Sequence, residues 1–222
     1  VVAVGSGRIM LLGLRGDRLE VTQVVDLPSQ WTDRIEAEDL DGDGRAEVIA
    51  TLYQIESESE LGSTEVVNYR WRAGSLEASE ILKVPKHVGD LVVGDVDGDS
   101  RPELLLETGL GEEGGEVIVY RSSWGHWNEA HRATATEGRV RALNLSLLPG
   151  NPGLLGVGST SGQIWYFDAD HRELRYRGSG REGVGLTGLL FLKGRYSDTK
   201  LLTGVTGRLG SGPEIRSSLF GF

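Results

Sequence analysis

Two short acidic segments carry the residues with the clearest chemistry in this 222-residue chain. The first, DLDGDGRAE, begins at Asp39, and the second, DVDGDSRPE, begins at Asp95. Each places an aspartate at positions 1, 3 and 5, and these side chains converge on one point when the backbone curls around it. Carboxylates crowded in this way repel one another unless a cation lies between them. The spacing therefore predicts a hard divalent cation in each turn.

Calcium takes six to eight oxygen ligands, and both segments continue with residues that extend the aspartate triplet. The carbonyl oxygen of the seventh residue and the acid at the ninth, directly or through water, complete each set. The first predicted set is Asp39, Asp41, Asp43, Arg45 and Glu47, and the second is Asp95, Asp97, Asp99, Arg101 and Glu103. We expect about two calcium ions per chain.

The sixth position differs between the two turns. Gly44 occupies it in the first turn and permits the positive φ that a tight turn requires, whereas Ser100 stands there in the second. A serine with positive φ carries a steric cost, so the second site is expected to be weaker or slightly reshaped.

The acidic segments have three other interpretations: an EF-hand, a dockerin-type module and hairpin turns without metal. An EF-hand needs a bidentate Glu at position 12 and a helix on each side. Position 12 is Ala50 in one segment and Leu106 in the other, and the flanks alternate as strands do. A dockerin-type module is excluded for the same reason. The alternative that stays open is a pair of solvated hairpin turns without metal, because Asp and Gly are common turn residues.

The acidic segments are part of a longer repeat. Residues 37–51 align with 93–107 without a gap, and the alternating segments EVVNYRW and EVIVYRS follow them. Weaker copies lie at 141–168 and 188–207, and the first residues of the chain resemble the second and third strands of a copy. Asn144, Ser146 and Leu148 align with the second aspartate triplet, so metal is expected in two copies alone. The predicted units are about 1–27, 28–84, 85–136, 137–181 and 182–222.

Each unit is predicted to contain four strands and no helix. In the second unit the strands are expected at Arg34–Glu38, Glu47–Thr51, Glu65–Trp71 and Leu76–Val84. The 33 glycines are consistent with many tight turns. Four-stranded units of this length indicate an all-β protein with the β-propeller fold. Five partial repeats are visible, so the chain is expected to be a single propeller domain or a fragment of a larger ring. A β-sandwich is the alternative.

The motifs DLDGDGRAEV and DVDGDSRPEL resemble the calcium-binding turns of FG-GAP repeats, which are integrin-α-like or bacterial VCBS-type. The family pattern, DxDxDGxxD, lies between the first two strands of a propeller blade. The resemblance implies that each ligand set named above holds one calcium ion. Glu47 and Glu103 stand where the family usually has Asp, and Ser100 replaces its glycine. Because calcium is abundant outside cells and scarce in the cytosol, an extracellular or cell-surface location is expected.

Charge and composition exclude several classes of function. The chain has 33 acidic and 23 basic residues, a net charge of −10, and no basic run, which argues against nucleic acid as a partner. No apolar run approaches the roughly 20 residues that a membrane span needs. The chain has no cysteine and no GxSxG motif, and its four histidines lack zinc spacing. We therefore expect a protein that is not an enzyme.

The expected function is a binding or adhesion module that recognises a protein or glycan on a propeller face. A lectin-type propeller is one alternative, and assembly of subunits through an open blade edge is another.

The sequence also predicts where the five tryptophans and one acidic run lie in the fold. Trp124 and Trp127 are expected to pack against the next blade, with stacking on a sugar ring as the alternative. Between blades we expect Trp31, Trp71 and Trp165, and the acidic run 56–60 is predicted to be a solvated loop.

Overall fold

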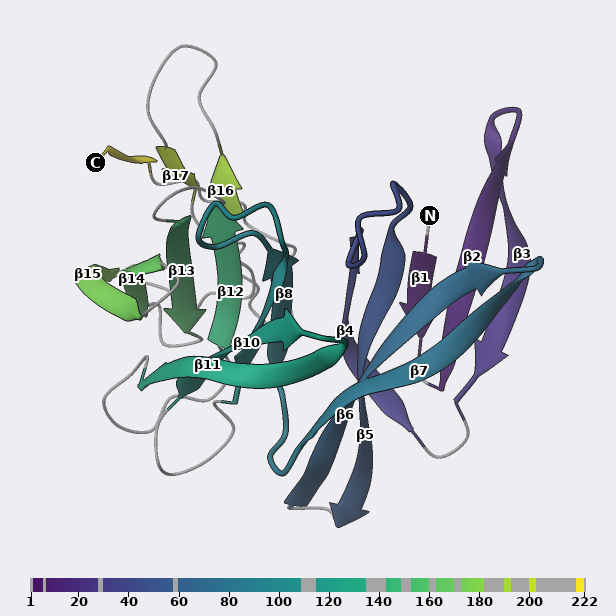
Figure 1. The fold of residues 1–222 in the computed structure, drawn as a ribbon, viewed down its shortest axis with the longest axis horizontal. Coiled ribbons are helices and arrows are strands. Elements are labelled where there is room, and N and C mark those ends of the chain that lie inside the picture. Colours follow the sequence, from purple (N-terminus) through teal and green to yellow (C-terminus); the bar gives the residue numbers. More distant parts are fainter. Residues whose placement is uncertain are drawn as a thin grey trace, which may run out of the picture. The chain divides into compact units, whose positions relative to one another are not determined.

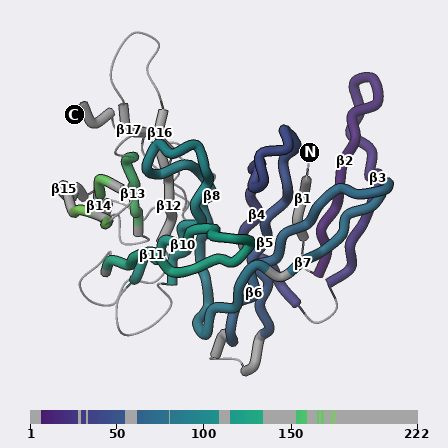
Figure 2. The backbone as a smooth tube through the Cα atoms, in the orientation of Figure 1, coloured from purple at the N-terminus to yellow at the C-terminus, as the bar shows by residue number. Residues whose placement is uncertain are grey.

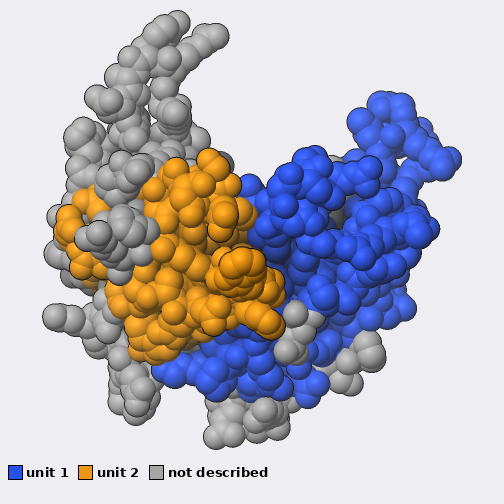
Figure 3. Space-filling model, viewed as in Figure 1, with its two compact units in different colours: residues 1–88 blue, residues 89–222 orange. Residues whose placement is uncertain are grey.

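The computed structural model describes residues 2–5, 7–27, 30–57, 60–108, 115–134, 143–148, 153–159, 163–169, 173–181, 190–192, 200–202 and 219–221. All regular secondary structure in these ranges is β-strand, which confirms the all-β class (Figure 1). The same residues include no helix that could cross a membrane. The chain divides into two compact units, residues 1–88 and 89–222, which Figure 3 distinguishes by colour.

The first unit contains two antiparallel sheets, each with its strands side by side in chain order (Figure 1). The three-stranded sheet consists of β1 (Val2–Gly5), β2 (Arg8–Arg15) and β3 (Arg18–Asp26). The four-stranded sheet consists of β4 (Trp31–Glu38), β5 (Glu47–Ser57), β6 (Glu60–Arg72) and β7 (Ser75–Val84). All four strands predicted for the second repeat are present.

The acidic run at 56–60, predicted to be a solvated loop, lies partly in strands. Ser57 ends β5 and pairs with Glu60 at the start of β6. Residues 58 and 59 lie outside the described part of the chain. The described ends of the run therefore continue the pairing of β5 and β6.

The second unit contains three antiparallel sheets in which the strands are again neighbours in chain order. The first consists of β8 (Asp90–Gly94), β9 (Glu103–Glu107), β10 (Glu116–Ser123) and β11 (His126–Thr134). The second consists of β12 (Leu143–Leu148), β13 (Gly153–Ser159), β14 (Gln163–Ala169) and β15 (Leu174–Arg181). The third consists of β16 (Leu190–Leu192), β17 (Lys200–Leu202) and β18 (Leu219–Gly221). Each of the five sheets falls within one of the five predicted repeat units.

Among hairpins between the last two strands of a sheet, three have a two-residue turn and four have a register shift. Two-residue turns close them at Gly16–Asp17, Ala73–Gly74 and Trp124–Gly125. The last two turns have positive φ at both residues, which matches the right-handed twist of the strands they join. A register shift interrupts the pairing in the β2–β3, β6–β7, β10–β11 and β14–β15 hairpins. Such bulges bend a strand and increase its local twist. The backbone of the β6–β7 hairpin curves along its length in Figure 2.

Each unit has a core in which side chains of one sheet meet those of the next. In the first unit, Ile9 and Leu27 pack with Val48, Ala50 and Leu52. Leu27 itself extends the three-stranded sheet, since its amide donates to the Gly7 carbonyl oxygen at 2.9 Å, just beyond the Arg8–Asp26 pair of β2 and β3. The core of the second unit is formed by Val96, Leu105, Val117, Val119, Leu155, Val157, Trp165 and Phe167. Sheets that are consecutive in the chain therefore bury apolar faces against each other.

The tryptophans follow their predicted places only in part. Trp165 is 7% exposed and belongs to the core, as expected. Trp31 and Trp71 are 43% and 46% exposed, so the prediction that they are core residues is wrong. Trp31 begins β4, and Trp71 lies one residue before the end of β6. At the ends of strands there is less neighbouring sheet to cover a large ring.

Candidate metal centres

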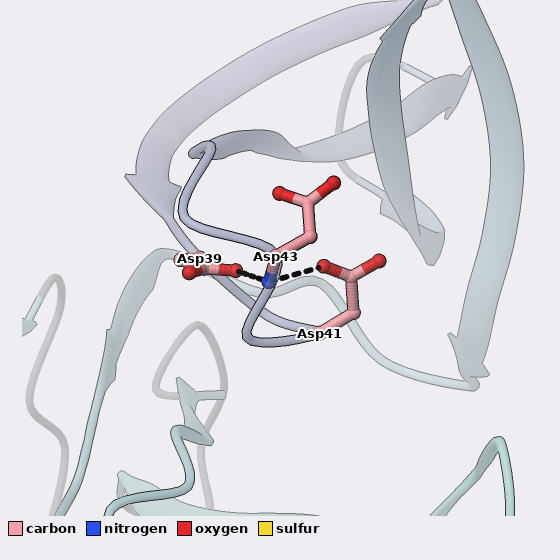
Figure 4. Close-up of side chains that lie close together, drawn as sticks. All are labelled: Asp39, Asp41 and Asp43. Atoms are coloured by element: carbon pink, nitrogen blue, oxygen red, sulfur yellow. Dashed lines mark hydrogen bonds between the residues drawn. The ribbon is translucent and has the colours of Figure 1, made fainter.

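The first acidic turn connects β4 to β5 and curls around the carboxylate of Asp39. One oxygen of Asp39, Oδ1, accepts hydrogen bonds from the amides of Gly42 at 2.8 Å and Asp43 at 3.1 Å. The other oxygen, Oδ2, accepts the amide of Gly44 at 2.8 Å. Figure 4 shows Asp43 between the two other aspartates, with its amide directed at both. One side chain thus satisfies three backbone donors and sets the path of the turn.

The other two aspartates continue the same local pattern. Asp41 Oδ1 accepts the amide of Asp43 at 3.2 Å, and Asp43 Oδ1 accepts the amide of Arg45 at 2.8 Å. Gly42 and Gly44 have φ of +75° and +83°, a region that a Cβ atom disfavours. The turn therefore needs both its short acidic side chains and its glycines.

The second turn, between β8 and β9, repeats all five hydrogen bonds. Asp95 accepts the amides of Gly98, Asp99 and Ser100 at 2.7, 3.1 and 2.9 Å. Asp97 accepts from Asp99 at 3.1 Å, and Asp99 accepts from Arg101 at 2.8 Å. Two segments that the sequence alignment matched without a gap therefore share one backbone geometry.

The described residues contain two groups whose acidic oxygens converge closely enough for one ion. The groups are Asp39, Asp41 and Asp43 in the first turn, and Asp95, Asp97 and Asp99 in the second; within each, one oxygen per residue lies within 4.8 Å of the others. Three carboxylates at this separation repel one another, and an all-oxygen donor set suits a hard cation such as calcium. The residues present thus fit the predicted ion.

Ser100 has a φ of +67°, so the positive φ on which the predicted cost depends is present. We predict that Ser100→Gly stabilises the protein by about 0.5–1 kcal/mol and that Gly44→Ser destabilises it by about 1 kcal/mol. No atom lies within 4 Å of a Cβ built on Gly44, so its cost arises from the backbone conformation.

Urea unfolding in EDTA measures both changes. Ser122→Gly is the control, because Ser122 is an exposed residue of β10 and is not among the positive-φ residues. A glycine there weakens the strand, so this variant should shift stability in the opposite direction from Ser100→Gly. Equal effects of the two serine variants would contradict the prediction.

The acids at position 9 are buried and lie outside the convergent groups. Glu47 is 3% exposed and accepts the amide of Leu40 at 2.9 Å, while Glu103 is 2% exposed and accepts the amide of Val96 at 3.0 Å. Each glutamate thus ties the start of the second strand to the second residue of its turn. Their assignment as cation ligands stays a prediction, as does that of the carbonyl oxygens of Arg45 and Arg101.

Burial changes the acidity of both glutamates. Desolvation raises the pKa of Glu47, and it raises the pKa of Glu103 to about 7. The amide bonds just described and a nearby arginine oppose this rise, whereas the neighbouring aspartates add to it. A cation in the turn would favour the ionised form of each acid.

Two arginines that the sequence analysis did not consider reach into the turns from the third strand of each sheet. Arg70 Nη2 lies 2.7 Å from Asp41 Oδ2, and Arg70 Nε lies 3.6 Å from Glu47 Oε1. In the second turn, Arg121 Nη2 pairs with Asp97 Oδ2, and its Nε lies 3.5 Å from Glu103 Oε1. A sequence signal existed, since Tyr-Arg occupies the same place in EVVNYRW and EVIVYRS.

The second turn is also fixed to the core of its unit through Val96. This side chain is fully buried between the β8–β11 and β12–β15 sheets, and its carbonyl oxygen accepts the amide of Gly153 at 3.0 Å. Its own amide donates to Glu103, as noted above. The shape of the turn is therefore coupled to the packing of consecutive sheets.

Other residues singled out in the sequence lie apart from the turns. Asn144, Ser146 and Leu148, which the sequence aligns with the second aspartate triplet, are part of β12, the first strand of its sheet, and not of the turn that follows it. His87 is buried and stacks edge-on against Tyr53, with ring centroids 4.6 Å apart, which is a packing role. His171 lies outside the described residues.

Trp124 contradicts its expected role in packing. It occupies the tip of the β10–β11 hairpin with a φ of +54° and is 98% exposed. A two-residue turn directs its side chain away from the sheet, so the ring covers no neighbouring strand. Trp127, three residues later in β11, is half-buried.

The chain matches no protein-family model and no curated protein. Its fold is similar to that of the rhamnogalacturonan lyase PL11 of Bacillus licheniformis, with a TM-score of 0.56 and 13% sequence identity. The similarity covers 89% of this chain and 48% of the lyase, so the chain spans about half the length of that structure. At this identity the similarity concerns the fold alone, and the expectation that the chain is not an enzyme stays a prediction.

Proposed function

We propose that this chain is an FG-GAP-like β-propeller, or part of one, in which two turns each bind a calcium ion and stabilise a binding module of a secreted or cell-surface protein. The observation that carries the proposal is the duplicated turn. The five hydrogen bonds around Asp39 recur around Asp95, and both turns hold three convergent carboxylates.

The arrangement of strands supports the propeller. Five antiparallel sheets follow one another along the chain, with the strands of each sheet in chain order. Both acidic turns join the first two strands of a four-stranded sheet, which is where the FG-GAP pattern has its calcium turn. Within each unit, consecutive sheets bury apolar faces against each other, as blades of a propeller do.

Calcium in these turns would act on stability. Every side chain in a triad comes from one short segment, which suits a structural ion better than a catalytic one. A site held at 100 times its dissociation constant adds about 2.7 kcal/mol to the stability of the fold. Outside the cell, where calcium is abundant, both turns would be loaded and the sheets held in shape for a protein or glycan partner.

Calorimetry tests the proposal directly. Protein freed of metal by EDTA and dialysis should bind about two calcium ions in an isothermal titration, and its Tm should rise by several degrees in millimolar calcium. Magnesium should bind more weakly, because it demands a smaller and more regular cage. A titration with no binding heat and no change in Tm would reject the proposal.

A glycan ligand is a second candidate function, and Trp124 favours it. An indole ring that is 98% exposed offers an apolar face, and Ser122 and Asn128 supply exposed polar groups on the flanking strands. Binding of labelled protein to an oligosaccharide array, lost in Trp124→Ala and kept in Leu14→Ala, would support this candidate. Leu14 is a suitable control because it is also an exposed apolar residue near a hairpin end. Equal binding by both variants would reject it.

A further inference from the structure

In each of the two sheets that carry an acidic turn, the third strand contributes an arginine that contacts two carboxylates of that turn. Arg70 contacts the aspartate at position 3 and the glutamate at position 9 of the first turn, and Arg121 makes the equivalent pair of contacts in the second. In each case Nη2 faces the aspartate and Nε faces the glutamate. This pair of contacts, called the arginine fork below, therefore occurs once in each of the two compact units.

We propose that Arg70 and Arg121 stand in for the cation: each neutralises and fixes the position-3 aspartate and the position-9 glutamate, which keeps its turn folded when calcium is absent. This inference rests on the proposed function, because it assigns roles to residues around the same two turns. Its consequence is that calcium strengthens a preformed turn instead of creating it.

Strand register places the arginines for this task. Val48 pairs with Tyr69, so Arg70 follows as the residue opposite Glu47 across β5 and β6. Leu104 pairs with Tyr120 in the same way, which brings Arg121 opposite Glu103 across β9 and β10. Opposite charges across neighbouring strands attract each other, and the planar guanidinium has donors for two carboxylates at once. An ammonium group has no such fixed fork.

Asp41 can still bind a cation while it contacts Arg70. In the first turn, Arg70 takes Oδ2 of Asp41, whereas Oδ1 accepts an amide of the turn and belongs to the side that faces Asp43. Fixing the side chain by two different partners restricts its rotamers. Calcium and the arginine both neutralise this carboxylate, so loss of the arginine should enlarge the stabilisation that calcium gives.

The two turns differ in how strongly they need the arginine. The side chains of Asp97 and Glu103 are 4% and 3% exposed, whereas that of Asp41 is 36% exposed. Buried carboxylates without a counter-charge are costly, and water compensates little for them. Arg121 should therefore matter more than Arg70 in calcium-free protein.

The test compares Arg70→Met with Arg121→Met, alone and combined, in EDTA and in 5 mM calcium chloride. Arg72→Met and Arg175→Met are the matched controls, because these arginines are exposed strand residues outside the two turns, one in each unit, and their replacement removes the same charge. In EDTA, Arg121→Met should lower the Tm by about 10 °C, Arg70→Met by about half as much, and the controls by less than about 3 °C. Calcium should then raise the Tm of each arginine-fork variant more than that of the parent protein.

Two results would overturn the inference. One is an equal loss of Tm in EDTA for the fork variants and the controls, which would mean that general charge and not the fork is responsible. The other is an equal calcium increment in all variants and the parent, which would mean that arginine and cation do not replace each other. If the combined variant does not fold, Arg70→Met in the more exposed turn decides the question. A parent protein that binds no calcium at all would reject the proposed function, whereas the comparison in EDTA would still test the fork.

Discussion

Asp39→Ala is expected to remove one calcium ion from the titration and to destabilise the calcium-free protein by about 2 kcal/mol. Both effects arise from the same carboxylate, which belongs to the convergent triad and also accepts the amides of Gly42, Asp43 and Gly44. Without it, three donors of a curled turn lose their acceptor, and a hydrogen bond to a charged group makes a net contribution of about 1.5–3 kcal/mol to stability.

The same loss of one calcium ion is expected in the second turn. Asp95→Ala should also remove one ion, and the combined variant should show no calcium heat and no calcium-dependent rise in Tm. Titration calorimetry counts the ions, and urea unfolding in EDTA gives the stability. Asp17→Ala serves as control, since Asp17 is an exposed acid in the β2–β3 turn and its loss should change stability by less than about 0.5 kcal/mol.

Asp39→Asn separates the two roles of the carboxylate. The amide oxygen of Asn can still accept the amides of Gly42 and Asp43, but its NH2 group cannot accept the amide of Gly44, and the side chain has no charge to offer a cation. Asp39→Asn should therefore lose less stability in EDTA than Asp39→Ala, while calcium affinity falls steeply. If Asp39→Ala kept both ions, the triad would not be the binding site, and the proposed function would fail at this turn.

Leu105→Ala should cost about 3–4 kcal/mol of unfolding free energy. Leu105 is fully buried in the cluster between the β8–β11 and β12–β15 sheets, beside Val119 on the adjacent strand. Truncation removes apolar contacts and leaves a cavity that strands held by hydrogen bonds on both sides cannot close.

Urea unfolding monitored by tryptophan fluorescence measures this cost, and Trp165 in the same cluster is a local reporter. Leu14→Ala is the matched control because it makes the same truncation at a side chain that is 70% exposed. Its effect should stay within about 0.5 kcal/mol. Similar losses for both leucines would contradict the assignment of the core to the face between these two sheets.

Calcium and the core are expected to act together in the second unit. Val96 is both the second residue of the acidic turn and a buried member of the core cluster, and it bonds to Gly153 of the next sheet. An ion that holds the turn therefore also favours the packing of consecutive sheets. This coupling explains physically why a structural ion suits a protein built from many short strands.

The features that the sequence predicted correctly depend on neighbouring residues. The curled turn is made by hydrogen bonds between Asp39 and amides three to five residues away, so its chemistry can be recognised from spacing alone. The strands and their succession within each sheet are equally local, because hairpins join residues close in the chain. Alternating apolar residues then identified the all-β class.

The features that only the tertiary structure decided involve residues brought together by strand register and by sheet packing. Arg121 and Asp97 are 24 residues apart in sequence and meet because β10 pairs with β9 in one particular register. The burial of Glu103 and the exposure of Trp71 likewise depend on what covers each position. A sequence pattern specifies which residues can bind an ion or enter a core, whereas distance and access to water are set by contacts between distant segments, and these determine how strongly each residue acts.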